Sequence, residues 1–159
     1  MSATFGFSES NGVTPTVTDA ISNLNFGSND SCNLTPATYP VVAGNNSFHK
    51  AIRAKFASIG TSISNMLFWK SAGTYVTGES IVAKNQASYV QPVDTALGGA
   101  SAVPTTSGTA LTIHGANGTD LALTSNGYTE YILLQLQTTG STPSGAVNQK
   151  TFTFQYDEV

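Results

Sequence analysis

The chain has 159 residues, about the length of one domain, with six basic and nine acidic residues and a formal net charge of −3. Ser, Thr and Asn occupy 52 positions, a composition typical of β-structure with many turns. Few Glu, Lys, Arg, Gln and Leu residues are present to cover exposed helix faces, which excludes a long helical bundle. The hydrophobic fraction of 40% excludes intrinsic disorder.

Cysteine content, the amino terminus and charge restrict the function further. Cys32 is the single cysteine, so no internal disulfide is expected. Residues 1–10 lack the basic and apolar regions of a secretory signal, and no apolar run approaches the roughly 20 residues of a membrane helix. Six basic residues are few for a phosphate-binding surface, and we interpret Lys50, Arg53 and Lys55 as the outward polar face of a strand. We therefore expect neither a nucleic-acid nor a membrane partner.

Short apolar or alternating runs recur along the chain, separated at intervals of about ten residues by clusters of Gly, Pro, Asn and Ser. This spacing is typical of an antiparallel β-sandwich, immunoglobulin-like or jelly-roll-like. We expect residues 21–159 to form a single β-sandwich domain. Residues 1–20 are expected to form an extended N-terminal arm or a first edge strand.

The clearest strands lie near the carboxyl end. Residues 151–157 alternate, with Phe152, Phe154 and Tyr156 predicted to point to one buried face. Residues 128–138 are apolar on both faces at their centre, which predicts a central strand covered on both sides. The polar segment between these strands predicts a loop of about a dozen residues.

Two upstream segments are less regular. Residues 109–114 and 121–124 flank an Asn117-Gly118 pair, which predicts a hairpin. Residues 98–108 have low complexity and predict an extended connection or an exposed loop.

One segment is compatible with either a helix or a strand. A spacing of four positions separates Phe48, Ile52 and Phe56, and this spacing suits one face of a helix or one face of a strand. The flanking residues favour a strand, followed by a second strand over residues 65–70.

The pattern of reactive residues does not point to catalysis. His49 and His114 lack an acid, His or Cys at ligand spacing in their own segments. Asp157 and Glu158 are adjacent on a predicted strand and therefore point to opposite faces. Residues 27–33 contain many side chains with oxygen atoms that could bind a cation, but they lack the alternating acids of a calcium-binding loop. An Asx turn is therefore the favoured interpretation of this segment. We expect no enzyme activity, no metal and no cofactor.

Several aromatic residues are candidates for an interface. Trp69 follows Phe68, so on a strand one ring faces inward and the other outward. Two further rings lie in a polar amino-terminal stretch that makes a poor strand, which fits an arm that docks onto a neighbour. The candidate interface residues are Phe5, Phe7, Tyr39, Trp69 and Tyr75.

Several longer segments of the chain follow one another in a recognisable order from about residue 24 to the end. They are FGSNDSCNL at 26–34, YPVVAGNNSF at 39–48, IRAKF at 52–56, FWKSAGTYVTGE at 68–79 and the stretch from STPSG at 141 to the acids at 157–158. In these segments the chain resembles a group of small virion proteins of tailed bacteriophages. The resemblance implies a β-sandwich built into the particle, in the capsid-decoration or the neck and tail class, with no catalytic residues to carry over.

The expected function is that of a capsid decoration or cement protein in the virion, which is assembled in the host cytoplasm. It would bind the major capsid protein, stabilise the shell against the pressure of the DNA, and form a homo-oligomer, with a trimer favoured. Low charge predicts contacts that are only weakly sensitive to salt. Two alternatives stay open: a neck or tail component of the same virion, and a carbohydrate-binding module with Trp69, Tyr75 and Tyr89 as stacking rings.

Overall fold

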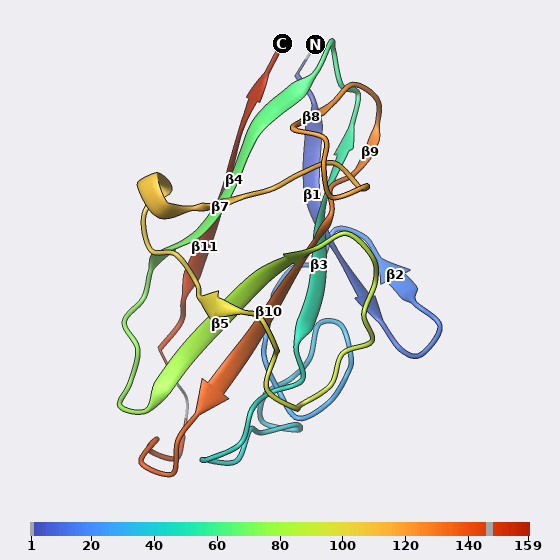
Figure 1. Cartoon of the computed structure of the whole chain (residues 1–159). Helices are drawn as coiled ribbons and strands as arrows, with labels where there is room; N and C mark the ends of the chain where they lie inside the picture. Colours follow the sequence, from blue (N-terminus) through green and yellow to red (C-terminus); the bar gives the residue numbers. More distant parts are fainter. Residues whose placement is uncertain (1, 146–147) are drawn as a thin grey trace.

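The computed structural model describes residues 2–145 and 148–159 and forms two antiparallel β-sheets. Sheet A has seven strands in the order β2-β1-β3-β10-β5-β6, with β9 also paired to β3. Sheet B has four strands in the order β11-β4-β7, with β8 also paired to β4. Figure 1 shows the two layers and the two termini at the same end of the molecule. The predicted antiparallel β-sandwich is confirmed.

Each sheet combines strands of eight or ten residues with strands of two or three residues. In sheet A the bounds are β1 Thr4–Asn11, β2 Thr16–Thr18, β3 Lys50–Ala57, β5 Glu79–Gln86, β6 Ser101–Ala102, β9 Gly127–Tyr128 and β10 Tyr131–Thr138. In sheet B they are β4 Ile63–Ala72, β7 Leu111–Thr112, β8 Ala122–Leu123 and β11 Thr151–Glu158, and a short 3₁₀ helix, η1, covers Ser107–Thr109.

Strand β10 lies in the middle of sheet A, between β3 and β5. Ile132, Leu133 and Leu134 are fully buried because both faces of this strand are covered. Ile132 and Leu134 belong to the main core between the sheets, whereas Leu133 packs in a second cluster on the outer face, where Tyr89 and Leu97 cover it. The predicted central strand covered on both sides is present over Tyr131–Thr138 but does not extend over the whole of 128–138, because Tyr128 belongs to β9, which pairs with β3.

The strands predicted over residues 48–56 and 65–70 are present as β3 and β4. Phe68 is buried in the core and Trp69 is half-buried on the other face, as strand alternation predicts. Phe152, Phe154 and Tyr156 of β11 pack against the core, so the predicted parity of this strand is also confirmed.

The structure does not confirm the N-terminal arm. β1 pairs with β3 through seven residue pairs, and β2 pairs with the end of β1. Phe7 packs against the core, and the buried hydroxyl of Ser8 donates to Asp19 at 2.6 Å. Long-range pairing with β3 thus overrides the weak strand propensity of this polar stretch.

Two other predictions from local patterns are wrong. β7 and β8 do not pair with each other as a hairpin: both pair with β4, although the Gly115 N–H does bond to the Asp120 carbonyl across the predicted reversal. Lys50 does not lie on an outward polar face. It has the same strand parity as Ile52 and points inward, where it is 1% exposed. Its ammonium can be buried because it pairs with the carboxylate of Glu9.

Irregular segments complete the covering of sheet A (Figure 1). Residues 20–48 cover part of its inner face, where Leu34 is buried. Residues 87–98 cover part of its outer face through Tyr89 and Leu97. Sheet B covers the rest of the inner face, so the main core is bounded partly by strands and partly by irregular chain.

Candidate functional site

The five predicted interface residues lie on different elements and do not form one patch. Phe5 and Phe7 are on β1, with ring centroids 5.1 Å apart. Tyr39 lies in the irregular segment before β3, Trp69 on the outer face of β4, and Tyr75 in the connection between β4 and β5. Phe5, Tyr39 and Tyr75 are exposed, at 36–37%. Of these five residues, the structure therefore brings together only Phe5 and Phe7.

The three rings of the expected carbohydrate platform are also separated. Tyr89 lies on the outer face of sheet A, 5.8 Å from the Tyr131 ring, and its hydroxyl donates to the Gly12 carbonyl at 2.7 Å. Burial raises the pKa of Tyr89 to about 12, so this hydroxyl stays a neutral donor. Trp69 lies on the outer face of sheet B, on the opposite side of the sandwich. These rings cannot stack on one sugar chain.

An aromatic seam closes the side of the sandwich where β1 and β11 lie. It consists of Phe5 and Phe7 of β1, Phe56 of β3, and Phe154 and Tyr156 of β11. Phe5 stacks on Phe154 at 5.3 Å, and Phe56 meets Tyr156 edge to face at 4.9 Å. The seam joins the two sheets, and part of it stays accessible to solvent.

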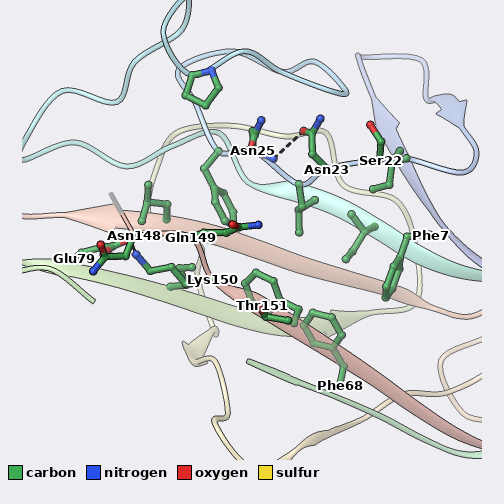
Figure 2. A pocket seen from close by; sticks show the side chains of 18 residues that line it. Phe7, Ser22, Asn23, Asn25, Phe68, Glu79, Asn148, Gln149, Lys150 and Thr151 are labelled. Atoms are coloured by element: carbon green, nitrogen blue, oxygen red, sulfur yellow. Dashed lines mark hydrogen bonds and ion pairs between the residues drawn. The ribbon is translucent and has the colours of Figure 1, made fainter. Parts of the chain in front are cut away.

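A cavity of about 610 Å³ lies between the inner face of sheet A, residues 21–26 and residues 148–152. Ile52, Ile81 and Leu136 of sheet A line it, together with Phe68 of sheet B. Figure 2 shows Glu79, Asn148 and Lys150 on one side of the cavity and Phe7 on the other. The walls thus combine apolar side chains with polar groups on more than one side, because Ser22, Asn23 and Asn25 lie apart from Glu79 and Asn148 (Figure 2).

A buried ion pair between Lys150 and Glu79 lies on one side of the cavity. The Lys150 ammonium lies 2.5 and 2.6 Å from the two carboxylate oxygens of Glu79, and the two side chains are 5% and 1% exposed. The Val76 N–H also donates to Glu79. The Tyr75 ring lies beside the ammonium groups of Lys150 and Lys70, at 5.5 and 4.9 Å, and burial raises the pKa of its hydroxyl. Tyr75 therefore lies beside the ammonium of the ion pair, although its ring does not line the cavity.

Each basic side chain is engaged by another part of the chain. The Lys55 ammonium, together with the Ser8 hydroxyl, lowers the pKa of Asp19 to about 2. Three of the six cations pair with a carboxylate that neutralises their charge, so only three remain whose charge could neutralise phosphates. The pairs are Lys50 with Glu9, Arg53 with the Tyr128 and Tyr131 rings, Lys55 with Asp19, Lys70 with the Gly73 carbonyl, Lys84 with the Gly98 carbonyl, and Lys150 with Glu79.

The residues considered for catalysis have structural partners. The Nδ1 atom of His49 accepts from the Val93 N–H at 3.3 Å, and burial lowers the pKa of this ring. The Nδ1 atom of His114 lies 2.6 Å from a carboxylate oxygen of Glu130. Burial, with Glu9 nearby, raises the pKa of the Cys32 thiol, which disfavours the nucleophilic thiolate. Within the described part of the chain, no group of three or more His, Cys, Asp or Glu residues could hold a metal ion.

Neither of the two buried ion pairs, Glu9–Lys50 and Glu79–Lys150, was predicted from the sequence. A signal for one was present: Glu9 shares the strand parity of Phe5 and Phe7, and Lys50 that of Ile52, so both charges stood at inward positions. The Glu79–Lys150 pair had no such signal, because its members are 71 positions apart and meet only in the folded chain.

Comparisons of the chain with protein-family models, with curated proteins and with solved structures found no match. Among residues 2–145 and 148–159, no helix has the length and apolarity needed to cross a lipid bilayer. What the protein does must therefore be inferred from its own fold, surface and composition.

Proposed function

We propose that this protein is a structural component of a virion, a capsid decoration protein that binds the major capsid protein and stabilises the shell. The observation that carries the proposal is the state of its charges: all six basic side chains are engaged within the chain. Such a surface recognises a partner by area and shape rather than by ion pairs.

Exposed apolar side chains support a function in protein contacts. Val42 is 64% exposed and Leu121 is 65% exposed, although both are large apolar residues. They lie at separate sites, in the segment before β3 and next to β8, so several surfaces could meet neighbours at once. A protein embedded in a lattice of subunits needs such multiple contacts.

The proposal includes a symmetric homo-oligomer, a trimer at a threefold site, within particles assembled in the host cytoplasm. A repeating shell offers the same patch many times, which favours a symmetric ligand. The binding should survive about 1 M salt, where the Debye length is about 3 Å. Rapid loss of the protein from particles at high salt would contradict the proposed mode of contact.

The decisive experiment is a count of this chain in purified particles, by quantitative mass spectrometry against the major capsid protein, combined with cryo-electron microscopy. Hundreds of copies on the outer shell are expected. Tens of copies at one vertex would favour the neck or tail alternative, and absence from particles would overturn the proposal.

A glycan array tests the carbohydrate-binding alternative independently. The separation of Trp69 from Tyr89 removes the platform expected for it, so no binding is expected. Specific retention of a glycan would favour that alternative over the proposed function.

A further inference from the structure

We infer that β11 is a self-association edge: two copies of the chain pair through it antiparallel about a twofold axis, joining their two copies of sheet B into one continuous sheet. This inference goes beyond the proposed function and does not rest on it: the twofold contact through β11 is separate from the threefold contact of the proposed trimer.

β11 is the long open edge of the sandwich. It has eight residues, and among the described residues its backbone pairing runs to β4 alone. The strands at the other sheet edges, β2, β6, β7 and β8, have two or three residues each. β1 extends beyond β2, but there the Ile21 N–H bonds to the Phe7 carbonyl at 3.1 Å. β11 therefore offers a row of backbone donors and acceptors that a further strand can use.

β11 carries little of the usual protection of an open edge. Its sequence, TFTFQYDE, contains no Lys, Arg or Pro, and its two charges, Asp157 and Glu158, lie at one end of the strand. Two irregularities interrupt its pairing with β4, but in both the extra residue lies in β4, near Ser71 and near Asn65, whose φ is +49°. The free edge of β11 is thus uninterrupted.

The side chains of β11 also indicate a missing neighbour. Phe152, Phe154 and Tyr156 face the core, yet each stays partly exposed. Phe5, which stacks on Phe154, is 37% exposed. One more strand beside β11 would continue sheet B and cover this row of rings.

The residue order of β11 makes a second copy the matching occupant. Antiparallel pairing centred on Phe154 places Phe152 opposite Tyr156 of the second copy, so rings meet rings on the inward face. On the outward face it places Thr153 opposite Gln155. Parallel pairing would instead place the two copies of Asp157 side by side, which is unfavourable. The antiparallel twofold arrangement is therefore the one selected.

The test measures the dimer dissociation constant of the full chain by sedimentation equilibrium. In Thr153→Lys/Gln155→Lys, four ammonium groups meet across the twofold axis, and the dissociation constant should rise by about tenfold or more. Both side chains face outward, so far-UV circular dichroism should stay unchanged. Thr112→Lys is the matched control, because it adds a charge to the opposite edge of sheet B, at an exposed position on β7.

A charge-swapped mixture tests the register. Thr153→Glu/Gln155→Glu should also dissociate alone, but an equal mixture with the double-lysine variant should form a one-to-one heterodimer, detected by native mass spectrometry. A wild-type chain that stays monomeric at about 1 mM, a dimer unaffected by the double-lysine change, or a trimer with β11 unpaired would overturn the inference. None of these results alters the count of copies per particle, which tests the proposed function separately.

Discussion

Sheet A is covered by two kinds of structure. Where sheet B lies on its inner face, the contact is made by apolar side chains such as Ile63, Met66 and Phe68, each 0–1% exposed. Where the irregular segments 20–48 and 87–98 cover it, buried polar side chains appear in the contact. These are Ser47, His49, Lys50 and Gln135, also 0–1% exposed.

The difference follows from where the backbone hydrogen bonds go. A strand satisfies its N–H and C=O groups within its own sheet, so its side chains can be apolar. An irregular segment leaves such groups unpaired, and side chains of sheet A must bind them. Gln135 does so three times: its amide donates to the Ser47 and Thr95 carbonyls, and its carbonyl accepts from the Leu97 N–H. Covering by irregular chain therefore depends on polar anchors.

The strand-covered region should be the more sensitive to loss of apolar volume. Phe56→Ala removes a ring that is 1% exposed and contacts Phe5, Phe154 and Tyr156, and should cost about 4 kcal/mol of unfolding free energy. Leu97→Ala, in the irregular cover, should cost less than half of that, because Leu97 is partly exposed. Urea denaturation of both variants measures the difference, and equal losses would contradict the comparison.

The ion pair at the cavity should show strong coupling. Lys150→Met leaves the buried Glu79 carboxylate without its cation and should cost about 3 kcal/mol. The double variant Lys150→Met/Glu79→Met removes both charges and should return to within about 1 kcal/mol of the wild type. Additive losses in the double-mutant cycle would show that the pair is not coupled.

Removal of a polar anchor should loosen the irregular cover selectively. Gln135→Leu keeps similar volume but leaves the Leu97 N–H and the Ser47 and Thr95 carbonyls without this partner, at a cost of about 2 kcal/mol. Amide hydrogen exchange should rise in residues 91–98 and stay unchanged in β4. Gln91→Leu, at an exposed position of the same segment, is the control and should change neither quantity.

The smallest expected effect is a pH dependence at His49. Burial lowers the pKa of the His49 ring in the folded chain, whereas in the unfolded chain this pKa is about 6.5. The unfolded chain therefore binds a proton at this ring more tightly than the folded chain does. Stability should therefore be complete above about pH 6.5 and decline as the pH falls from there toward the folded pKa. His49→Gln should remove this decline, measured by denaturation between about pH 8 and about pH 5, whereas His114→Gln should retain it.

Strand parity was predictable wherever the sequence alternates. Phe152, Phe154 and Tyr156 were assigned to the buried face because a strand turns successive side chains to opposite faces whatever its partners are. The face to which a strand residue points depends only on its position along the strand, so it can be read from the amino-acid sequence.

The partners of each strand were not predictable in the same way. Residues 1–20 were expected to form an arm or a first edge strand, since their polar composition favours strands weakly. β1 instead makes seven pairs with β3, which join segments more than 40 positions apart. For the same reason β7 and β8 pair with β4 rather than with each other. The cavity also depends on such distant contacts, because residues 21–26, Glu79 and residues 148–152 line it together.

The amino-acid sequence by itself determined the class of the protein: composition and period-two alternation require half-buried antiparallel strands with a weakly charged exterior. Tertiary structure alone decided which strands became edges, which charges were buried in pairs, and how much of the aromatic seam stayed exposed. The reason is physical. Side-chain direction in a strand is a local property of the backbone, whereas pairing, burial and edges depend on which distant segments compete for the same hydrogen bonds and the same apolar surface.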